Sequence, residues 1–331
     1  MAHALTQRKD GMFEFAQLEG ETAWHGHGNA VPADSSLEVW MGKAGMDWRL
    51  LRTRVRFISG MRGDTAEYGA MDDKCVLVRS DTRAGLAIVS DSYKIVQPRE
   101  VLEFFRDLVS RAGFKLNTAG TLFDGRKFWA SARVEADAPI ANAADKVGGF
   151  LLLSTSCDGT METEARFTTT RVVCNNTLQM ARGSVAQVKV SHRSVFNPDA
   201  VKDKLGIERG LWAEFLRQSR AMAQRPMSLG ETRAFVDALM GLSLEDADNQ
   251  EAIDEVREMR AHKRIMTLIH EGKGANLPGV KGTLWGTLNA ATEFVDHFRK
   301  AASPEQRFFN AQWGTGEDLK EKAREQALAL I

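Results

Sequence analysis

Two Asp-Gly pairs stand between stretches of strand-forming residues, and they constrain the fold more than any other feature of the sequence. One is Asp124-Gly125 and the other is Asp158-Gly159. The segments on either side of them are, in chain order, KLNTAGTLF, KFWASARVEA, GGFLLLSTS and EARFTTTRVVC. An Asp-Gly pair between such segments favours a tight hairpin, because both residues tolerate the positive φ that the turn requires. We therefore expect two antiparallel hairpins, and a third where DTRA separates KCVLVRS from GLAIVS.

A helix is expected between these strands, and several more after them. PREVLEFFRDLVSRAG, residues 98–113, starts with a proline, places apolar side chains on one face and ends at a glycine. After residue 190 the apolar spacing becomes mostly helical. We expect an α+β fold, in which an antiparallel β-sheet packs with helices and a mostly helical C-terminal region follows. The expected domains are an N-terminal irregular segment with a short helix (1–48), an α+β core domain (49–200) and a helical C-terminal region packed on the core (201–331).

The charges of the chain balance overall but are unevenly distributed. The 331 residues include 44 basic residues (Lys and Arg) and 44 acidic ones. Residues 165–198 contain no acidic residue, whereas residues 231–258 are strongly acidic. Such segregation favours a basic working surface in the first two-thirds of the chain and an acidic helical region behind it. The alternative interpretation is an ordinary fluctuation of charge along the chain.

Hydropathy and cysteine content indicate a soluble protein of a reducing compartment. The sequence has no apolar run of the roughly 18–20 residues that a membrane span needs, and nothing resembles a signal peptide. The three cysteines, Cys75, Cys157 and Cys174, form no CxxC pair and leave at least one thiol unpaired. We therefore expect a cytoplasmic protein with no membrane partner.

Cys174 is the first candidate for chemistry. It ends the β-branched run RVVC, and the following NNTLQMAR is expected to open a helix. A thiol at a helix N-terminus would have a lowered pKa, but a cysteine nucleophile also needs a base, and His192 is the nearest histidine in sequence. A free cysteine at the end of a buried strand commonly packs as a small hydrophobic residue. We interpret Cys174 as structural.

His25 and His27 are the second candidate. Two histidines in HGHG could bind a metal ion in an extended segment, but no HExxH or zinc-finger spacing supplies the remaining ligands. The glycine-rich EGKGANLPGVKGTLWG matches no phosphate-binding loop. We therefore expect no catalytic residue, no metal and no cofactor.

Basic residues on strands are the strongest signal for a binding function. Arg52, Arg54 and Arg56 alternate with less polar residues in LLRTRVRF, so they would share one face of a strand at a spacing of roughly 7 Å. That spacing approaches the spacing of phosphates on a single nucleic-acid strand, and Trp129 could stack on bases. The candidates for nucleic-acid binding are Arg52, Arg54, Arg56, Arg166, Arg171, Arg182, Lys189, Arg193 and Trp129. The alternative interpretation is that the arginines form a solvated face of a sheet and the aromatic residue belongs to the core.

Several blocks of the sequence together resemble a known family. They are AWHGHGNAV, AGMDWRL, SDSYKIVQPREVLEFF, TTTRVVCNNTLQMA and GTLWGTLNAATEFVDHFR, in this order between residues 24 and 299. They resemble the phage/plasmid-like protein family that carries domain of unknown function 932. This resemblance implies a setting in mobile DNA elements of a bacterial host, but it implies no mechanism.

The expected function is non-catalytic binding of nucleic acid, namely single-stranded DNA, in phage or plasmid recombination or replication. The expected sheet with its basic strands resembles, in outline, the single-strand annealing proteins of phage recombination. We expect a homo-oligomer in the cytoplasm of the bacterial host. Two alternatives stay open: an enzyme of unknown type that uses His25, His27 or Cys174, and a phage factor that binds a host protein through its acidic helices.

Overall fold

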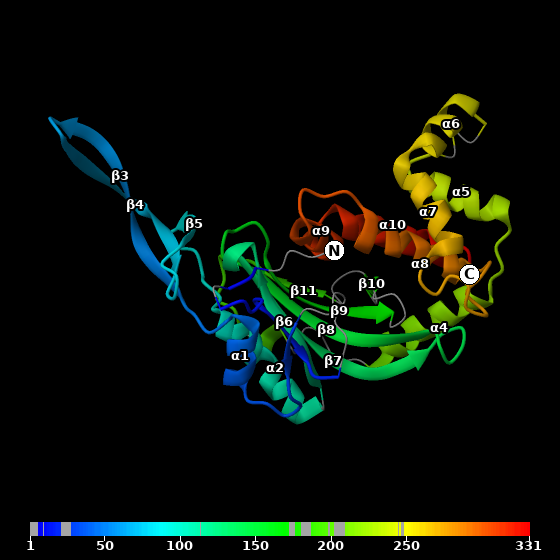
Figure 1. The fold of residues 1–331 in the computed structure, drawn as a ribbon, viewed down its shortest axis with the longest axis horizontal. Helices are drawn as coiled ribbons and strands as arrows, with labels where there is room; N and C mark the ends of the chain where they lie inside the picture. Colours follow the sequence, from blue (N-terminus) through cyan, green and yellow to red (C-terminus); the bar gives the residue numbers. More distant parts are fainter. Residues whose placement is uncertain are drawn as a thin grey trace.

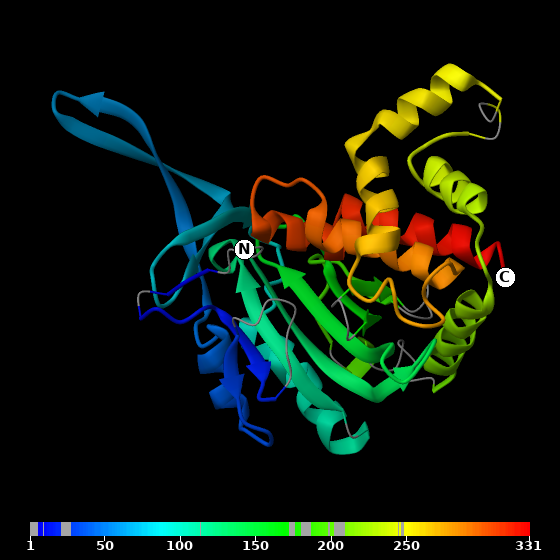
Figure 2. The ribbon, with the colours of Figure 1, turned by 45° about the vertical axis from the view of Figure 1, so that its right-hand side comes forward.

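The molecule consists of a central twisted β-sheet with helices on both faces and a projection at each end (Figure 1). One projection is a long β-hairpin, and the other is a group of helices; a second view from a different side shows the same separation (Figure 2). The computed structural model describes the whole chain except residues 1–5, 9, 21–27, 113, 172–175, 180–186, 198, 202–208, 244 and 246–247.

The central sheet runs in the order β10-β9-β8-β7-β6-β1-β2, and β11 pairs with β9 beside β10. Its strands are β1 (Phe15–Leu18), β2 (Asn29–Val31), β6 (Lys115–Leu122), β7 (Lys127–Pro139), β8 (Lys146–Ser156), β9 (Thr163–Arg171), β10 (Asn176–Gln179) and β11 (Gln187–Val190). All pairings are antiparallel except the one between β1 and β2, which is parallel. The sheet and the helical C-terminal half together confirm the expected α+β class.

The turn chemistry of the sequence explains the hairpins. Between β6 and β7, a short 3₁₀ turn η1 (Phe123–Gly125) contains Asp124 at φ 59° and Gly125 at φ 94°. Positive φ values of this kind are what Asp-Gly supplies at low steric cost. The predicted β6–β7, β8–β9 and β4–β5 hairpins are all confirmed by antiparallel pairing.

A second, three-stranded sheet forms the β-projection. Its strands are β3 (Leu50–Arg62), β4 (Thr65–Arg79) and β5 (Gly85–Ser90), in the order β3-β4-β5. The strand β5 pairs only with residues 74–78 of β4, so the ribbon beyond that point has two strands. We call this two-stranded part, together with Arg54 at its base, the arm; it comprises residues 54–73. The sequence predicted a strand at its beginning but not its full length.

The described helices are α1 (Leu37–Ala44), α2 (Pro98–Ala112), α4 (Arg209–Gln224), α5 (Leu229–Leu239), α6 (Gln250–Glu258), α7 (Arg260–Glu271), α8 (Leu284–Glu293), α9 (Pro304–Trp313) and α10 (Thr315–Leu328), with a π-helical turn η2 (Phe294–Phe298) after α8. The predicted helix at 98–113 is confirmed by α2, which buries Phe104 and Phe105 completely. In contrast, α5, α6 and α7 project from the body, with α6 outermost (Figure 1).

Helices cover both faces of the central sheet, and the alternation of side chains along β7 shows how. Phe128 belongs to the large core cluster that includes Phe104 of α2. The next residue, Trp129, belongs to a second cluster with Phe308 of α9. Since successive side chains of a strand point to opposite faces, α2 and α9 lie on opposite sides of the sheet.

Two segments differ from the sequence-based expectation. Residues 176–179 were predicted to begin a helix, but they form β10, which pairs with β9 and buries Leu178. Pairing at a sheet edge outweighs the weak helical preference of Asn and Thr there. The N-terminal segment, expected to be irregular, contributes β1 and β2 to the central sheet. The domain boundaries 1–48, 49–200 and 201–331 stay a prediction.

Candidate nucleic-acid interface

The arm places an unusual set of side chains in solvent. Large apolar residues, which normally lie in a core, are exposed along both of its strands: Phe57, Ile58, Met61, Tyr68 and Met71. Tyr68 is 66% exposed and Ile58 is 62% exposed. Exposed apolar side chains gathered on one element are typical of an interaction surface. An isolated two-stranded ribbon is also only marginally stable in water, so contact with a partner would stabilise the arm.

The strand register determines which side chains share a face of the arm. Ile58 lies directly opposite Tyr68 on the neighbouring strand, and Arg56 lies opposite Ala70. Because side chains alternate along β3, Arg56 and Ile58 point to the same side as Tyr68. Arg54 comes two residues before Arg56, lies opposite Cys75 and is separated from the regular pairing by a register shift after it. We call Arg54, Arg56, Ile58 and Tyr68 the arm face. Phe57 points to the other side, where its ring covers Gly69 so closely that a Cβ at that position would lie 2.7 Å from the ring.

The two strands of the arm carry opposite charges. Every charged residue of β3 is an arginine, whereas the part of β4 within the arm, residues 65–73, carries only acidic ones: Glu67 and the adjacent Asp72 and Asp73. Arg62 pairs with Glu67 at 3.6 Å near the tip. Within the described part of the chain, the guanidinium groups of Arg54 and Arg56 have no hydrogen-bond or ion-pair partner. These two exposed cations are therefore available to an external anion.

Arg52, by contrast, serves the root of the arm. Its Nη1 donates a hydrogen bond to the Asp91 carbonyl at 2.7 Å and lies 3.6 Å from the Asp91 carboxylate. Its Nη2 donates to the carbonyl of Tyr93. These contacts hold the segment after β5 against β3. The sequence correctly placed Arg52 on a strand, but its side chain is engaged within the protein.

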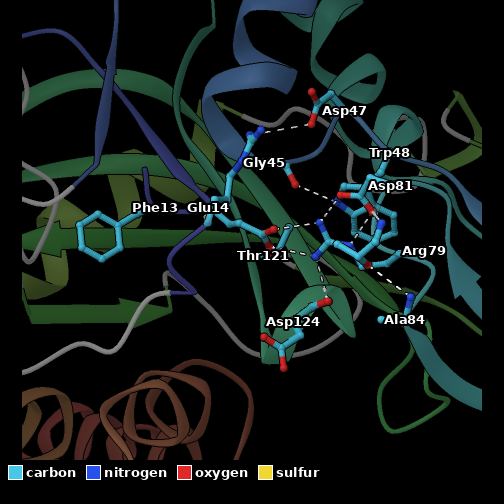
Figure 3. Close-up of polar contacts among 12 residues, drawn as sticks. Phe13, Glu14, Gly45, Asp47, Trp48, Arg79, Asp81, Ala84, Thr121 and Asp124 are labelled. Atoms are coloured by element: carbon cyan, nitrogen blue, oxygen red, sulfur yellow. Dashed lines mark hydrogen bonds and ion pairs between the residues drawn. The ribbon is translucent and has the colours of Figure 1, made fainter. Parts of the chain in front are cut away.

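A buried ion pair anchors the arm to the body (Figure 3). Arg79, at the end of β4, makes two hydrogen bonds to Glu14, with Nη2–Oε1 at 2.8 Å and Nη1–Oε2 at 3.2 Å. Both side chains are only 5% exposed. Glu14 also accepts a hydrogen bond from the hydroxyl of Thr121 on β6. The arm is therefore connected to the central sheet by a two-point, charge-assisted contact, which is geometrically specific.

The remaining contacts of Arg79 complete this anchor. Nε and Nη2 donate to the carboxylate of Asp81 at 3.0 and 2.9 Å, and Nη1 donates to the carbonyl of Asp124 at 2.9 Å. The guanidinium lies 4.4 Å from the centre of the Trp48 ring. Burial lowers the pKa of Arg79, but the bonds to Asp81 and Glu14 outweigh it and raise the pKa above the ordinary value. Arg79 therefore stays charged, and the arm projects from a fixed root.

Two of the predicted binding residues are buried, and for them the prediction was wrong. Trp129 is 2% exposed and packs between Phe15 and Phe308, with ring centres 5.7 and 6.0 Å away. Arg166 is also 2% exposed; its guanidinium lies 3.3 Å from the Glu164 carboxylate and donates to the main-chain carbonyl of Gln312. The physical reason is α9, which covers the face of the sheet that the sequence suggested was open.

Of the other residues predicted to bind nucleic acid, two are exposed on the body and two have side chains that the structure does not describe. Lys189 and Arg193 are exposed on the body, and the Lys189 ammonium lies 4.0 Å from Glu164. The side chains of Arg171 and Arg182 lie outside the described part of the structure, as do Cys174, His25 and His27. Of the residues that are described, no group of three or more His, Cys, Asp or Glu could hold a metal ion.

A buried polar network beside β10 was not foreseen from the sequence. The Lys320 ammonium is completely buried and lies 3.1 Å from Asp296, 3.3 Å from Glu317 and 2.8 Å from the hydroxyl of Thr177. The adjacent cavity under α9 has a volume of only about 40 Å³. A space of this size holds a few water molecules but is too small for an organic substrate. We therefore interpret the network as structural.

The exposed arm was itself missed by the sequence analysis, although a signal was present. Gly63-Asp64 stands between β-forming residues, and Gly63 adopts φ 58° in the turn. Such a Gly-Asp pair between two strand-forming segments is a hairpin signal.

None of the helices in the described ranges combines the length and hydropathy that a membrane crossing requires.

Comparison with known proteins places the chain in one family. The family model described as domain of unknown function (DUF932) matches residues 85–314, which is more than half of the chain. The arm precedes the matched range. Searches of curated proteins and of solved structures returned no match. The strands β5 to β11 and the helices α2 to α9 lie within the matched range, and the chain belongs to the DUF932 family.

Proposed function

We propose that the protein binds single-stranded DNA, without catalysis, along the arm face. One observation carries the proposal: two arginines without internal partners, Arg54 and Arg56, share this face with the exposed ring of Tyr68. Cations that follow a strand and an aromatic ring beside them are the two elements with which proteins bind single strands irrespective of sequence.

The dimensions of the arm face support this proposal. Residues two apart on a strand are separated by roughly 7 Å, which approaches the spacing of phosphates along an extended single strand. A base stacked on an aromatic side chain contributes about 1–3 kcal/mol. Bases in a duplex are already stacked on each other, so Tyr68 would favour single strands over double strands. Lys189 and Arg193 on the body stay candidates for further phosphate contacts.

The biological setting that we propose rests on the family resemblance. It is recombination or replication of phage or plasmid DNA in the bacterial cytoplasm, in the manner of an annealing protein that acts as a homo-oligomer. The alternatives are an enzyme that uses His25, His27 or Cys174, which lie outside the described residues, and a phage factor that binds a host protein through its acidic helices.

Fluorescence anisotropy with labelled single- and double-stranded oligonucleotides at several salt concentrations tests the proposal. We expect salt-sensitive binding that prefers single strands. Replacing Arg54→Gln together with Arg56→Gln should flatten the slope of log K against log salt by about 1.4, because two phosphate contacts are lost. Tyr68→Ala should weaken binding by about 1–3 kcal/mol with little change in that slope.

A matched control removes two exposed arginines at the other end of the molecule, Arg233→Gln and Arg260→Gln. It changes the net charge by the same amount and should leave the slope unchanged. Binding that is equally reduced by both double variants would show that only net charge matters. Absence of binding to either form of DNA at low salt would refute the proposal.

A further inference from the structure

Among the residues that the structure describes, the molecule presents unpaired arginines at one end and unpaired carboxylates at the other. The arm projects from one end of the long axis and α6 from the other, and this separation is visible in both views (Figures 1 and 2). The arm contributes the unpaired cations Arg54 and Arg56. The helix α6 has the sequence QEAIDEVRE and exposes most of its carboxylates. A cationic strand and an anionic helix are thus too far apart to meet within one chain.

Two carboxylates of α6 match the two free arginines of the arm. Asp254 accepts a hydrogen bond from Gln250, and Glu258 pairs with Lys263 at 2.5 Å. Glu251 and Glu255, in contrast, are exposed and have no side-chain partner among the residues that the structure describes. They are four residues apart and therefore neighbours on one face of the helix, about 5–6 Å from each other.

We propose that the arm of one molecule docks onto α6 of a second copy of the same chain. The spacing of Arg54 and Arg56, roughly 7 Å, is close to that of Glu251 and Glu255, so two ion pairs can form at once. The arm face also brings the exposed side chains of Ile58 and Tyr68. On the other side, Met259 follows α6 directly and is 40% exposed, which provides an apolar contact next to the carboxylates.

The geometry of this contact determines the type of assembly. The two surfaces differ and lie at opposite ends, so the contact is head-to-tail and not two-fold symmetric. A pair keeps one free α6, on the molecule whose arm is docked, and one free arm, on its neighbour. A head-to-tail contact of this kind propagates into an open chain or closes into a ring. Exposed ion pairs are individually weak and screened by salt, so the assembly should be reversible and salt-sensitive.

The same contact would regulate the proposed function. If the arm face binds single-stranded DNA as proposed above, then α6 of a neighbour presents carboxylates where phosphates would lie and competes for Arg54 and Arg56. Only this competition rests on the proposed function; the self-association does not. Loss of the α6 carboxylates should therefore strengthen DNA binding at protein concentrations where the wild type associates.

Sedimentation velocity over a range of protein and salt concentrations tests the inference. The wild type should associate at low salt and dissociate as salt is raised. The variants Arg54→Glu/Arg56→Glu and Glu251→Arg/Glu255→Arg should each reduce the association constant by at least about tenfold, since like charges then face each other. A mixture of the two variants should associate again, because their altered surfaces are once more complementary. All four positions are exposed, so circular dichroism should show unchanged folding.

The outcomes separate this inference from the proposed function. If the α6 variant associates like the wild type, or if mixing the two variants restores nothing, α6 is not the docking site and the inference is overturned. A wild type that stays monomeric at low salt overturns it as well. Neither result bears on DNA binding. That binding is measured by fluorescence anisotropy on the variant Glu251→Arg/Glu255→Arg, because its arm is unchanged.

Discussion

Replacing Arg79→Met tests whether the buried ion pair anchors the arm. Methionine has a similar length and is apolar, so the change removes the charge and the donors while keeping most of the volume. The substitution leaves the carboxylate of Glu14 with only the Thr121 hydroxyl as a donor in the described contacts of that side chain. It also removes the donor to the Asp124 carbonyl and the contact with the Trp48 ring.

We expect the free energy of unfolding to fall by about 3–5 kcal/mol, which is typical when one partner of a buried pair is removed. Most of this cost comes from Glu14, because its side chain is 5% exposed and cannot be rehydrated. Asp81 contributes little, since its side chain is 41% exposed and solvent screens its charge. Adding Glu14→Gln to Arg79→Met removes the unpaired carboxylate, so the double variant should be more stable than Arg79→Met alone.

Equilibrium unfolding in urea, followed by circular dichroism and tryptophan fluorescence, measures these differences. Arg49→Met is the matched control, because Arg49 is exposed next to the same strand and should change stability by less than about 0.5 kcal/mol. The reasoning would be refuted if Arg79→Met cost under about 1 kcal/mol, or if Glu14→Gln in that background destabilised the protein further.

Three more predictions follow from particular contacts. Gly125→Ala should destabilise the fold by about 1–3 kcal/mol in urea unfolding, because φ is +94° and the new Cβ would lie 2.8 Å from the Trp48 ring. The control Gly63→Ala should lower the free energy of unfolding by less, because Gly63 also has a positive φ but lies in open space. Trp129→Ala should cost about 3–5 kcal/mol and leave DNA affinity per folded molecule unchanged, in contrast to Tyr68→Ala. Burial raises the pKa of Asp158, but hydrogen bonds from Thr160 and the charge of Lys127 outweigh it and lower the pKa below its ordinary value. A lowered carboxylate pKa stabilises the fold above pH of about 4 and loses this effect as the pH falls, so the stability difference between wild type and Asp158→Asn should shrink in unfolding experiments at decreasing pH.

Local features of the sequence determined several elements of this protein. Asp124-Gly125 and Asp158-Gly159 favour hairpins because the turn needs residues that accept positive φ, and that requirement is satisfied within a few residues of chain. The apolar spacing of residues 98–113 likewise specifies α2 by itself. From these signals the α+β class could be predicted, and so could the strand that carries Arg54 and Arg56.

Only the tertiary structure decided which of these side chains are available. Trp129 and Arg166 looked free on a sheet with one solvated face, but α9, more than 130 residues further along the chain, covers that face. Glu14 and Arg79 meet across 65 residues, and no local pattern connects them. Local conformation is set by steric preferences of neighbouring residues, whereas burial and charge pairing depend on contacts between distant segments. Local sequence therefore determined the hairpins and α2, whereas pairing with distant strands decided β1, β2 and β10. The packing of the helices on the sheet left Arg54, Arg56 and Tyr68 exposed on the arm.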